Sequence, residues 1–74
     1  MLDDLVVIDT VAASSLEAND YIEWAGDRYE VLSTEDESTW VQVEARNLDT
    51  EDDETLIMEP WDQISLLGYD HSEN

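Results

Sequence analysis

The chain has 74 residues, enough for one small domain, and it contains 21 Asp and Glu residues against 2 Lys and Arg, a formal net charge of -19. Hydrophobic residues make up 42% of the sequence, which is too much apolar material for a disordered acidic chain. The absence of Cys excludes disulfides and thiolate zinc sites, and the charge would repel nucleic acid and anionic membranes.

Between residues 5 and 69 the apolar residues recur mainly at every second position, which predicts β-strands rather than helices. Leu5–Ile8 is a first β-prone run, and Leu16 in the following turn is expected to plug the core. Tyr21–Trp24 and Tyr29–Thr34 are predicted to pair as a hairpin around Gly26, whose backbone freedom suits a tight turn.

The segment 40–46 alternates most regularly between apolar and polar residues, as a half-buried strand does. The two predicted faces carry Val41, Val43 and Ala45 on one side and Trp40, Gln42, Glu44 and Arg46 on the other. We expect the first face to point into the core and the second to point toward solvent.

An acidic loop at 49–54 precedes a predicted strand at Thr55–Glu59. Pro60 should end its pairing, and 61–63 is predicted to form a short 3₁₀ turn before a last strand at Ile64–Leu67. Five or six short strands predict an all-β fold, a small Greek-key or SH3-like barrel whose closure would protect the strand edges. We expect a single domain over residues 1–74, with flexible ends at 1–4 and 70–74.

Two segments resemble a known family. Ser15–Glu23, with Gly26, Tyr29, Val31 and Leu32 after it, resembles the opening hairpin of the KOW-like first domain of elongation factor P. Val41–Thr50 resembles that domain's later segment, a valine-rich strand followed by Asn-Leu and Thr. Pro60–Ile64 is similar to the turn and strand that end SH3 domains. The resemblance implies a KOW-like barrel.

The sequence departs from that family in the loop between the two segments. The family carries a Gly/Pro-rich loop with a modifiable Lys there, whereas this chain has Glu35-Asp36-Glu37-Ser38-Thr39 and no Lys at all. The charge of a surface that should approach RNA is therefore inverted, and the translation function is not carried over. The Ala-Leu-Tyr-Asp-Tyr signature of peptide-binding SH3 domains is also absent, so recognition of Pro-rich peptides is not carried over.

The sequence offers little for catalysis or metal binding. The single His, His71, lies in the expected tail, so an enzyme is not predicted. Asp49 and the acids at 51–54 could collect a hard cation, but they lack the central Gly and the distant Glu of an EF-hand loop. We interpret this stretch as a solvated acidic loop and predict no metal site and no cofactor.

The aromatic residues could line a recognition groove, but in a chain without Phe most of them are expected to fill the core. Trp40 is the exception, because it shares the polar face of its strand with Gln42 and Glu44. Arg28 and Arg46 are each expected to pair with neighbouring carboxylates, with little net stabilisation.

The charge itself is the feature that points to a function, and one hypothesis is a nucleic-acid mimic. Carboxylates on one face of a strand recur roughly every 7 Å, and duplex DNA carries one phosphate per strand per roughly 3.4 Å of axis. An acidic ridge could then occupy the groove of a basic nucleic-acid-binding protein as an inhibitor or decoy, for which a phage or mobile element would be a natural source. The predicted partner-binding residues are Glu35, Asp36, Glu37, Trp40, Glu44, Asp49, Glu51, Asp52, Asp53 and Glu54.

Two other readings stay open at this point. The acidity also suits adaptation to a high-salt cytoplasm, with an unrelated function. The chain could instead be an adaptor or a virion subunit that docks through a strand edge or an aromatic patch.

No apolar run approaches the roughly 18–20 residues that cross a membrane, and Asp3 and Asp4 stand where a secretion signal is basic. A cytoplasmic location is therefore expected, in the host if the chain is phage-encoded.

Overall fold

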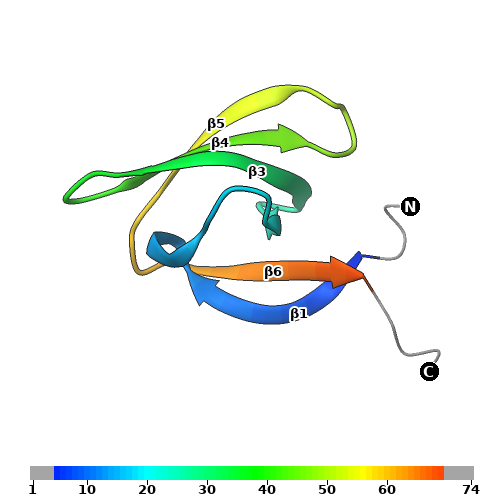
Figure 1. Ribbon diagram of the computed structural model, residues 1–74, viewed down its shortest axis with the longest axis horizontal. Helices are drawn as coiled ribbons and strands as arrows, with labels where there is room; N and C mark the ends of the chain where they lie inside the picture. Colours follow the sequence, from blue (N-terminus) through cyan, green and yellow to red (C-terminus); the bar gives the residue numbers. More distant parts are fainter. Residues whose placement is uncertain (1–4, 70–74) are drawn as a thin grey trace.

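Six antiparallel strands form one continuous sheet in the computed structural model, which describes residues 5–69 (Figure 1). The strands are β1 (Leu5–Ala12), β2 (Tyr21–Trp24), β3 (Asp27–Asp36), β4 (Val41–Asn47), β5 (Asp53–Met58) and β6 (Gln63–Tyr69), and a short 3₁₀ helix, η2, spans Ala13–Ser15. The predicted all-β, SH3-like fold class is confirmed. The expectations for the ends at 1–4 and 70–74, and for His71, lie outside the described residues.

The order of the strands across the sheet is β1-β6-β2-β3-β4-β5. Strands β2 to β5 form a meander of consecutive hairpins, β6 returns to pair with β2, and β1 adds a further strand outside β6. Figure 1 shows the sheet curling, so that β1 and β6 lie across the molecule from β3, β4 and β5. The expectation that closure protects the edges is wrong, because β1 pairs with β6 rather than with β5 and both end strands keep one free edge within residues 5–69.

The predicted hairpin around Gly26 is confirmed, and its loop consists of Ala25 and Gly26. Both residues have positive φ, 54° and 87°, as the two central residues of a type I′ turn require. This turn follows the right-handed twist of the flanking strands.

Strand β5 begins at Asp53, two residues before the predicted start at Thr55. Asp53 lies opposite Arg46 and Glu54 lies opposite Ala45, so two residues expected in the acidic loop belong to the ladder. β1 likewise continues four residues beyond Ile8 to Ala12, because it stays paired with β6.

The 3₁₀ turn predicted at 61–63 is absent there, and the described 3₁₀ helix is η2. Glu59 and Asp62 instead close a four-residue turn: the Asp62 N–H donates to the Glu59 carbonyl at 3.0 Å, and the Glu59 N–H donates to Asp62 Oδ2 at 3.0 Å. The η2 segment is held to this turn through Ala13, whose N–H donates to the Asp62 carbonyl at 2.9 Å.

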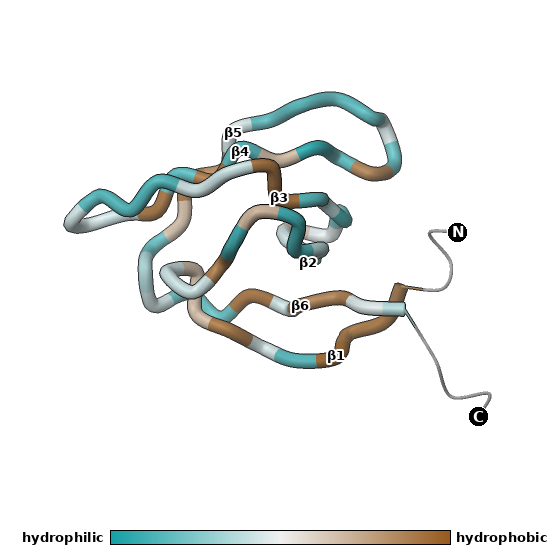
Figure 2. The backbone as a smooth tube through the Cα atoms, in the orientation of Figure 1, coloured by the Kyte–Doolittle hydropathy of each residue, from teal (hydrophilic) through white to brown (hydrophobic). Residues whose placement is uncertain are grey.

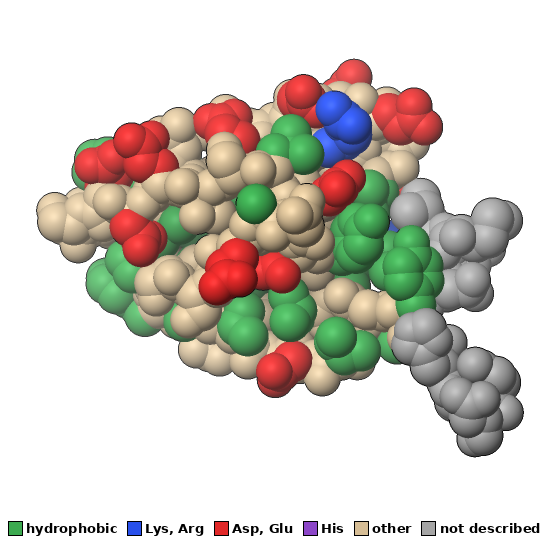
Figure 3. All heavy atoms as spheres, in the orientation of Figure 1, with side chains coloured by type: hydrophobic (Ala, Val, Ile, Leu, Met, Phe, Trp, Pro, Cys, Tyr) green, Lys and Arg blue, Asp and Glu red, His purple; other side chains and the backbone are tan. Residues whose placement is uncertain are grey.

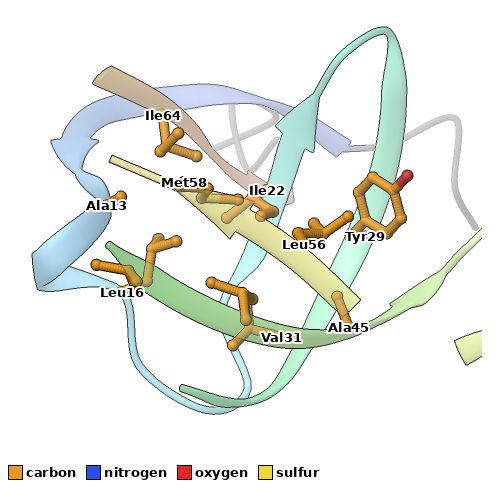
Figure 4. Close-up of a cluster of buried hydrophobic side chains, with 11 residues drawn as sticks. Ala13, Leu16, Ile22, Tyr29, Val31, Ala45, Leu56, Met58 and Ile64 are labelled. Carbon is orange, nitrogen blue, oxygen red and sulfur yellow. The ribbon is translucent and has the colours of Figure 1, made fainter. Parts of the chain in front are cut away.

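The core lies inside the curl of the sheet (Figure 4). Alternate residues of β4, namely Val41, Val43 and Ala45, are buried as predicted, and Leu16 closes the core as the expected plug. The buried cluster consists of Ala13, Leu16, Ile22, Tyr29, Val31, Val41, Val43, Ala45, Leu56, Met58 and Ile64.

The expectation that most aromatic residues fill the core is wrong. Of the six, Tyr29 is buried and Trp24 packs partly against the core, whereas Trp40, Trp61 and Tyr69 are exposed. Aliphatic side chains and Met58 already occupy the narrow interior of so small a sheet, which leaves the larger rings at its margins.

Polarity divides between the two sides of the molecule. Figure 2 shows β1 and β6 mainly in the colours of hydrophobic residues, whereas the loop before β5 is hydrophilic. Between residues 5 and 69, no helix is long and apolar enough to span a membrane.

Candidate protein-binding surface

The outward side of β3, β4 and β5 is the most acidic surface that the strands build. Cross-strand partners share a face of a sheet, so the residues opposite the core-facing ones can be assigned from the register. Three outward rows run across these strands: Glu30, Arg46 and Asp53; Ser33, Glu44 and Thr55; Glu35, Gln42 and Ile57. We call Glu30, Glu35, Glu44 and Asp53 the carboxylate face.

Glu44 lies at the centre of the carboxylate face, and neighbouring side chains fix its orientation. The Gln42 amide donates to Glu44 Oε2 at 3.0 Å, and the Thr55 hydroxyl donates to Glu44 Oε1 at 2.9 Å. Both donors are neutral, so they position the carboxylate without cancelling its charge. A positioned charge loses less conformational entropy when it meets a partner.

The two arginines lie near the β4–β5 loop and pair with neighbouring carboxylates, as predicted. Arg46 Nε donates to Asp53 Oδ1 at 3.0 Å, and Arg28 Nη2 lies 3.5 Å from Asp49 Oδ1. The hydrogen bond to Asp53 raises the pKa of Arg46, which keeps the guanidinium charged. All four side chains are partly exposed, so these pairs orient the acids more than they stabilise the fold.

The β4–β5 loop is organised by Asn47, which is buried at its base. Asn47 Oδ1 accepts hydrogen bonds from the N–H of Asp49 at 2.8 Å and of Thr50 at 3.1 Å. The Glu51 N–H donates to the Asn47 carbonyl at 2.7 Å, and Glu51 has a positive φ of 64°. The loop thereby holds Asp49, Glu51 and Asp52 exposed to solvent.

The second acidic cluster lies at the opposite end of β4, at the end of β3 and in the β3–β4 turn. The Glu37 N–H donates to the Trp40 carbonyl at 2.9 Å, which closes the turn and leaves Glu35, Asp36 and Glu37 exposed. Trp40 is 43% exposed. The seven residues of β4 rise roughly 20 Å, and the carboxylate face spans this distance between the two clusters.

Two of the predicted partner-binding residues lie on the other side of the sheet. Asp36 is opposite Val41 and Glu54 is opposite Ala45, so both share the core-facing side at its margin. The Tyr29 hydroxyl donates to Glu54 Oε1 at 3.1 Å. The structure thus places Glu35, Glu44 and Asp53 on the carboxylate face, and Glu37, Trp40, Asp49, Glu51 and Asp52 in the flanking turns.

Sequence reasoning missed Glu30 and the edge residues Thr55 and Ile57. Glu30 alternates with the buried Tyr29 and Val31, so the two-residue period of β3 could have placed it on the outward face. Ile57 is 57% exposed between the buried Leu56 and Met58. Because all three residues are apolar, the sequence shows no alternation that would place Ile57 on the outward face.

The acidity is not confined to this surface. Figure 3 shows acidic side chains along the rim over β3, β4 and β5, and others scattered over the rest of the visible face. Within residues 5–69, no three Asp, Glu or His side chains converge as metal ligands would. A shallow hollow open to solvent is lined by Arg46, Asn47, Leu48 and Glu51.

Comparison with protein-family models finds no matching family, and comparisons with curated proteins and with solved structures find no match either.

Proposed function

We propose that this protein is a non-enzymatic acidic binding protein that occupies the nucleic-acid groove of a basic partner, as an inhibitor or decoy. The observation that carries the proposal is the carboxylate face, which joins two exposed acidic clusters over roughly 20 Å along β4. Within this proposal the KOW-like barrel is a scaffold for charge rather than a translation factor domain.

The electrostatics favour such a partner. A formal net charge of -19 attracts basic proteins and accelerates their association at low ionic strength. The same charge repels nucleic acid, so the proposed complex is one with a protein that binds DNA or RNA. Its action would take place in the cytoplasm, where such partners are found, or in a host cytoplasm if a phage encodes it.

The test is capture of partners from a cell lysate at about 0.1 M salt, where the screening length is about 10 Å, followed by elution in a salt gradient. We expect a basic nucleic-acid-binding protein to elute as salt rises, and duplex DNA to compete with the immobilised protein for it. Retention of no such protein, or capture that DNA does not affect, would contradict the proposal.

The site itself is tested by neutralising four acids at once. The variant Glu35→Gln/Glu44→Gln/Glu51→Gln/Asp52→Asn removes charge from the carboxylate face and the β4–β5 loop, and should abolish capture. The matched control, Glu17→Gln/Glu23→Gln/Asp27→Asn/Glu59→Gln, removes the same charge from exposed positions elsewhere. Equal loss in both variants would show that capture depends on net charge and not on this surface.

A second candidate function is supported by the exposed apolar side chains near the same surface. Trp40 precedes β4, and Ile57 lies on the outward side of β5 beside Gln42. Large exposed apolar side chains are typical of protein–protein interfaces, so an adaptor or structural subunit would dock here. In that case capture should tolerate high salt and fail with Trp40→Ala.

A further inference from the structure

The two edge strands of the sheet differ in how their free edges are protected. β1 is interrupted by a register shift between Val7 and Asp9, a bulge that twists an edge away from other strands. The N–H of Thr10 donates to Asp9 Oδ1 at 2.8 Å, so this edge group is already satisfied by a side chain. Natural sheets use such devices to prevent pairing with other chains.

The edge of β5 carries neither device. Its register with β4 runs without a shift from Arg46–Asp53 to Val41–Met58. Among the hydrogen bonds formed within residues 5–69, no side chain accepts from the N–H of Asp53, Thr55 or Ile57. β4 is its sole neighbour in the described sheet.

The hydrogen-bond pattern shows which groups face the free edge. The Asn47 N–H donates to the Asp52 carbonyl at 2.8 Å, and in an antiparallel ladder such pairs alternate with pairs that exchange no main-chain hydrogen bonds. Asp53, Thr55 and Ile57 therefore direct their N–H and carbonyl groups away from β4. The close side-chain contacts from Arg46 to Asp53 and from Thr55 to Glu44 agree, because side chains approach most closely in the pairs without main-chain bonds.

We infer that the free edge of β5 receives an extended, basic segment of the partner as an added antiparallel or parallel strand. This inference rests on the proposed function and specifies how the partner is held. Charge identifies the occupant: Asp53 and Glu54 begin the strand and Glu44 lies one strand away, so a basic segment is attracted, whereas a second copy with net charge -19 is repelled.

The side chains of the added strand would alternate between the two faces. Those on the outward side lie beside Asp53, Thr55 and Ile57, so Lys or Arg fits near Asp53 and an apolar residue fits near Ile57. Main-chain hydrogen bonds to the edge would supply affinity, and this alternation would supply specificity.

The test uses an eight-residue peptide that alternates Lys and Val, and a control peptide of equal charge that alternates Lys and Pro. Wild-type protein should bind the first peptide, and the second about tenfold or more weakly, because Pro cannot donate to an edge. Thr55→Pro removes the central edge N–H and should weaken binding of the Lys-Val peptide to the level of the control peptide. A matched variant on the other edge, Thr10→Pro in β1, should keep wild-type binding within about twofold.

Hydrogen exchange of the wild-type protein provides a measurement that does not depend on the folding of Thr55→Pro. The Lys-Val peptide should slow exchange at Thr55 and Ile57. No binding of this peptide, equal binding of both peptides, or unchanged exchange at these amides would overturn the inference. If the edge behaves as expected while DNA fails to compete for captured partners, the proposed function is wrong and the docking edge stands.

Discussion

The hydroxyl of Tyr29 donates a hydrogen bond to Glu54 Oε1 over 3.1 Å, and this contact connects the buried core to an acidic residue at the margin of the sheet. Burial, together with the hydrogen bond to Glu54, raises the pKa of Tyr29 above its ordinary value of 10.0. The buried core and the margin of the sheet therefore meet at one side chain.

Alkaline pH should destabilise the protein through Tyr29. Because its pKa is raised in the folded state, the unfolded chain loses the proton first, so this contribution is present below pH 10.0 and is lost as pH rises above it. Urea unfolding between neutral pH and about pH 11 should show this decline, and Tyr29→Phe should reduce it. At neutral pH, Tyr29→Phe should lower the free energy of unfolding by about 1–2 kcal/mol, because it removes the hydrogen bond from the phenol to Glu54.

The tight turn offers a stabilising substitution. Ala25 has a positive φ of 54°, which is unfavourable for a residue with a Cβ, whereas Asn tolerates this conformation and favours type I′ turns. Ala25→Asn should therefore raise the free energy of unfolding by about 0.5–1 kcal/mol. Urea denaturation measures the difference, and Ala18→Asn, at an exposed loop position without positive φ, should change little. A loss of stability in Ala25→Asn would show that the turn geometry is misassigned.

Two neighbouring residues of β5 should respond very differently to truncation. Met58 is 2% exposed and Ile57 is 57% exposed, because they point to opposite faces of the strand. Met58→Ala should cost roughly 2–5 kcal/mol of unfolding free energy through the cavity it leaves. Ile57→Ala should cost about 0.5 kcal/mol or less. Similar losses in thermal or urea unfolding for both variants would contradict the assigned register of β5.

Salt should stabilise the fold by screening repulsion among the carboxylates. At a formal net charge of -19, we expect the urea midpoint to rise with added salt. Most of the gain should come by a few tenths molar, since the screening length is about 3 Å at 1 M. A midpoint that keeps rising steeply into molar salt would instead support adaptation to a high-salt cytoplasm, and would weaken the decoy proposal.

The sequence contains enough information to predict the parts of this fold that local patterns control. The alternation of Val41, Val43 and Ala45 gives the buried face of β4 directly, and Gly26 marks the β2–β3 turn. These features depend on side-chain period and backbone freedom, which are visible in a few consecutive residues.

Features that depend on pairing between strands far apart in the chain could not be predicted from local sequence patterns. The free edge of β5 depends on β1 pairing with β6, and nothing in Leu5–Ile8 specifies that choice of neighbour. The inclusion of Asp53 and Glu54 in a strand follows from pairing with β4, which overrides their low strand propensity. The candidate surface was predicted in part: its acids are in the right segments, but the sides of the sheet occupied by Asp36 and Glu54 follow from the register.

The pairing of Leu5 with Tyr69 brings the first and last described residues next to each other (Figure 1). A short linker from Tyr69 to Leu5 would turn β6 and β1 into a hairpin, and new termini could then be introduced in the exposed β3–β4 turn, between Ser38 and Thr39. Such a circular permutant would retain every strand pairing. β6 and β1 would become consecutive in the chain, and β3 and β4 would pair from its two opposite ends. The order in which this chain runs through its sheet is thus one of several that the same architecture accommodates.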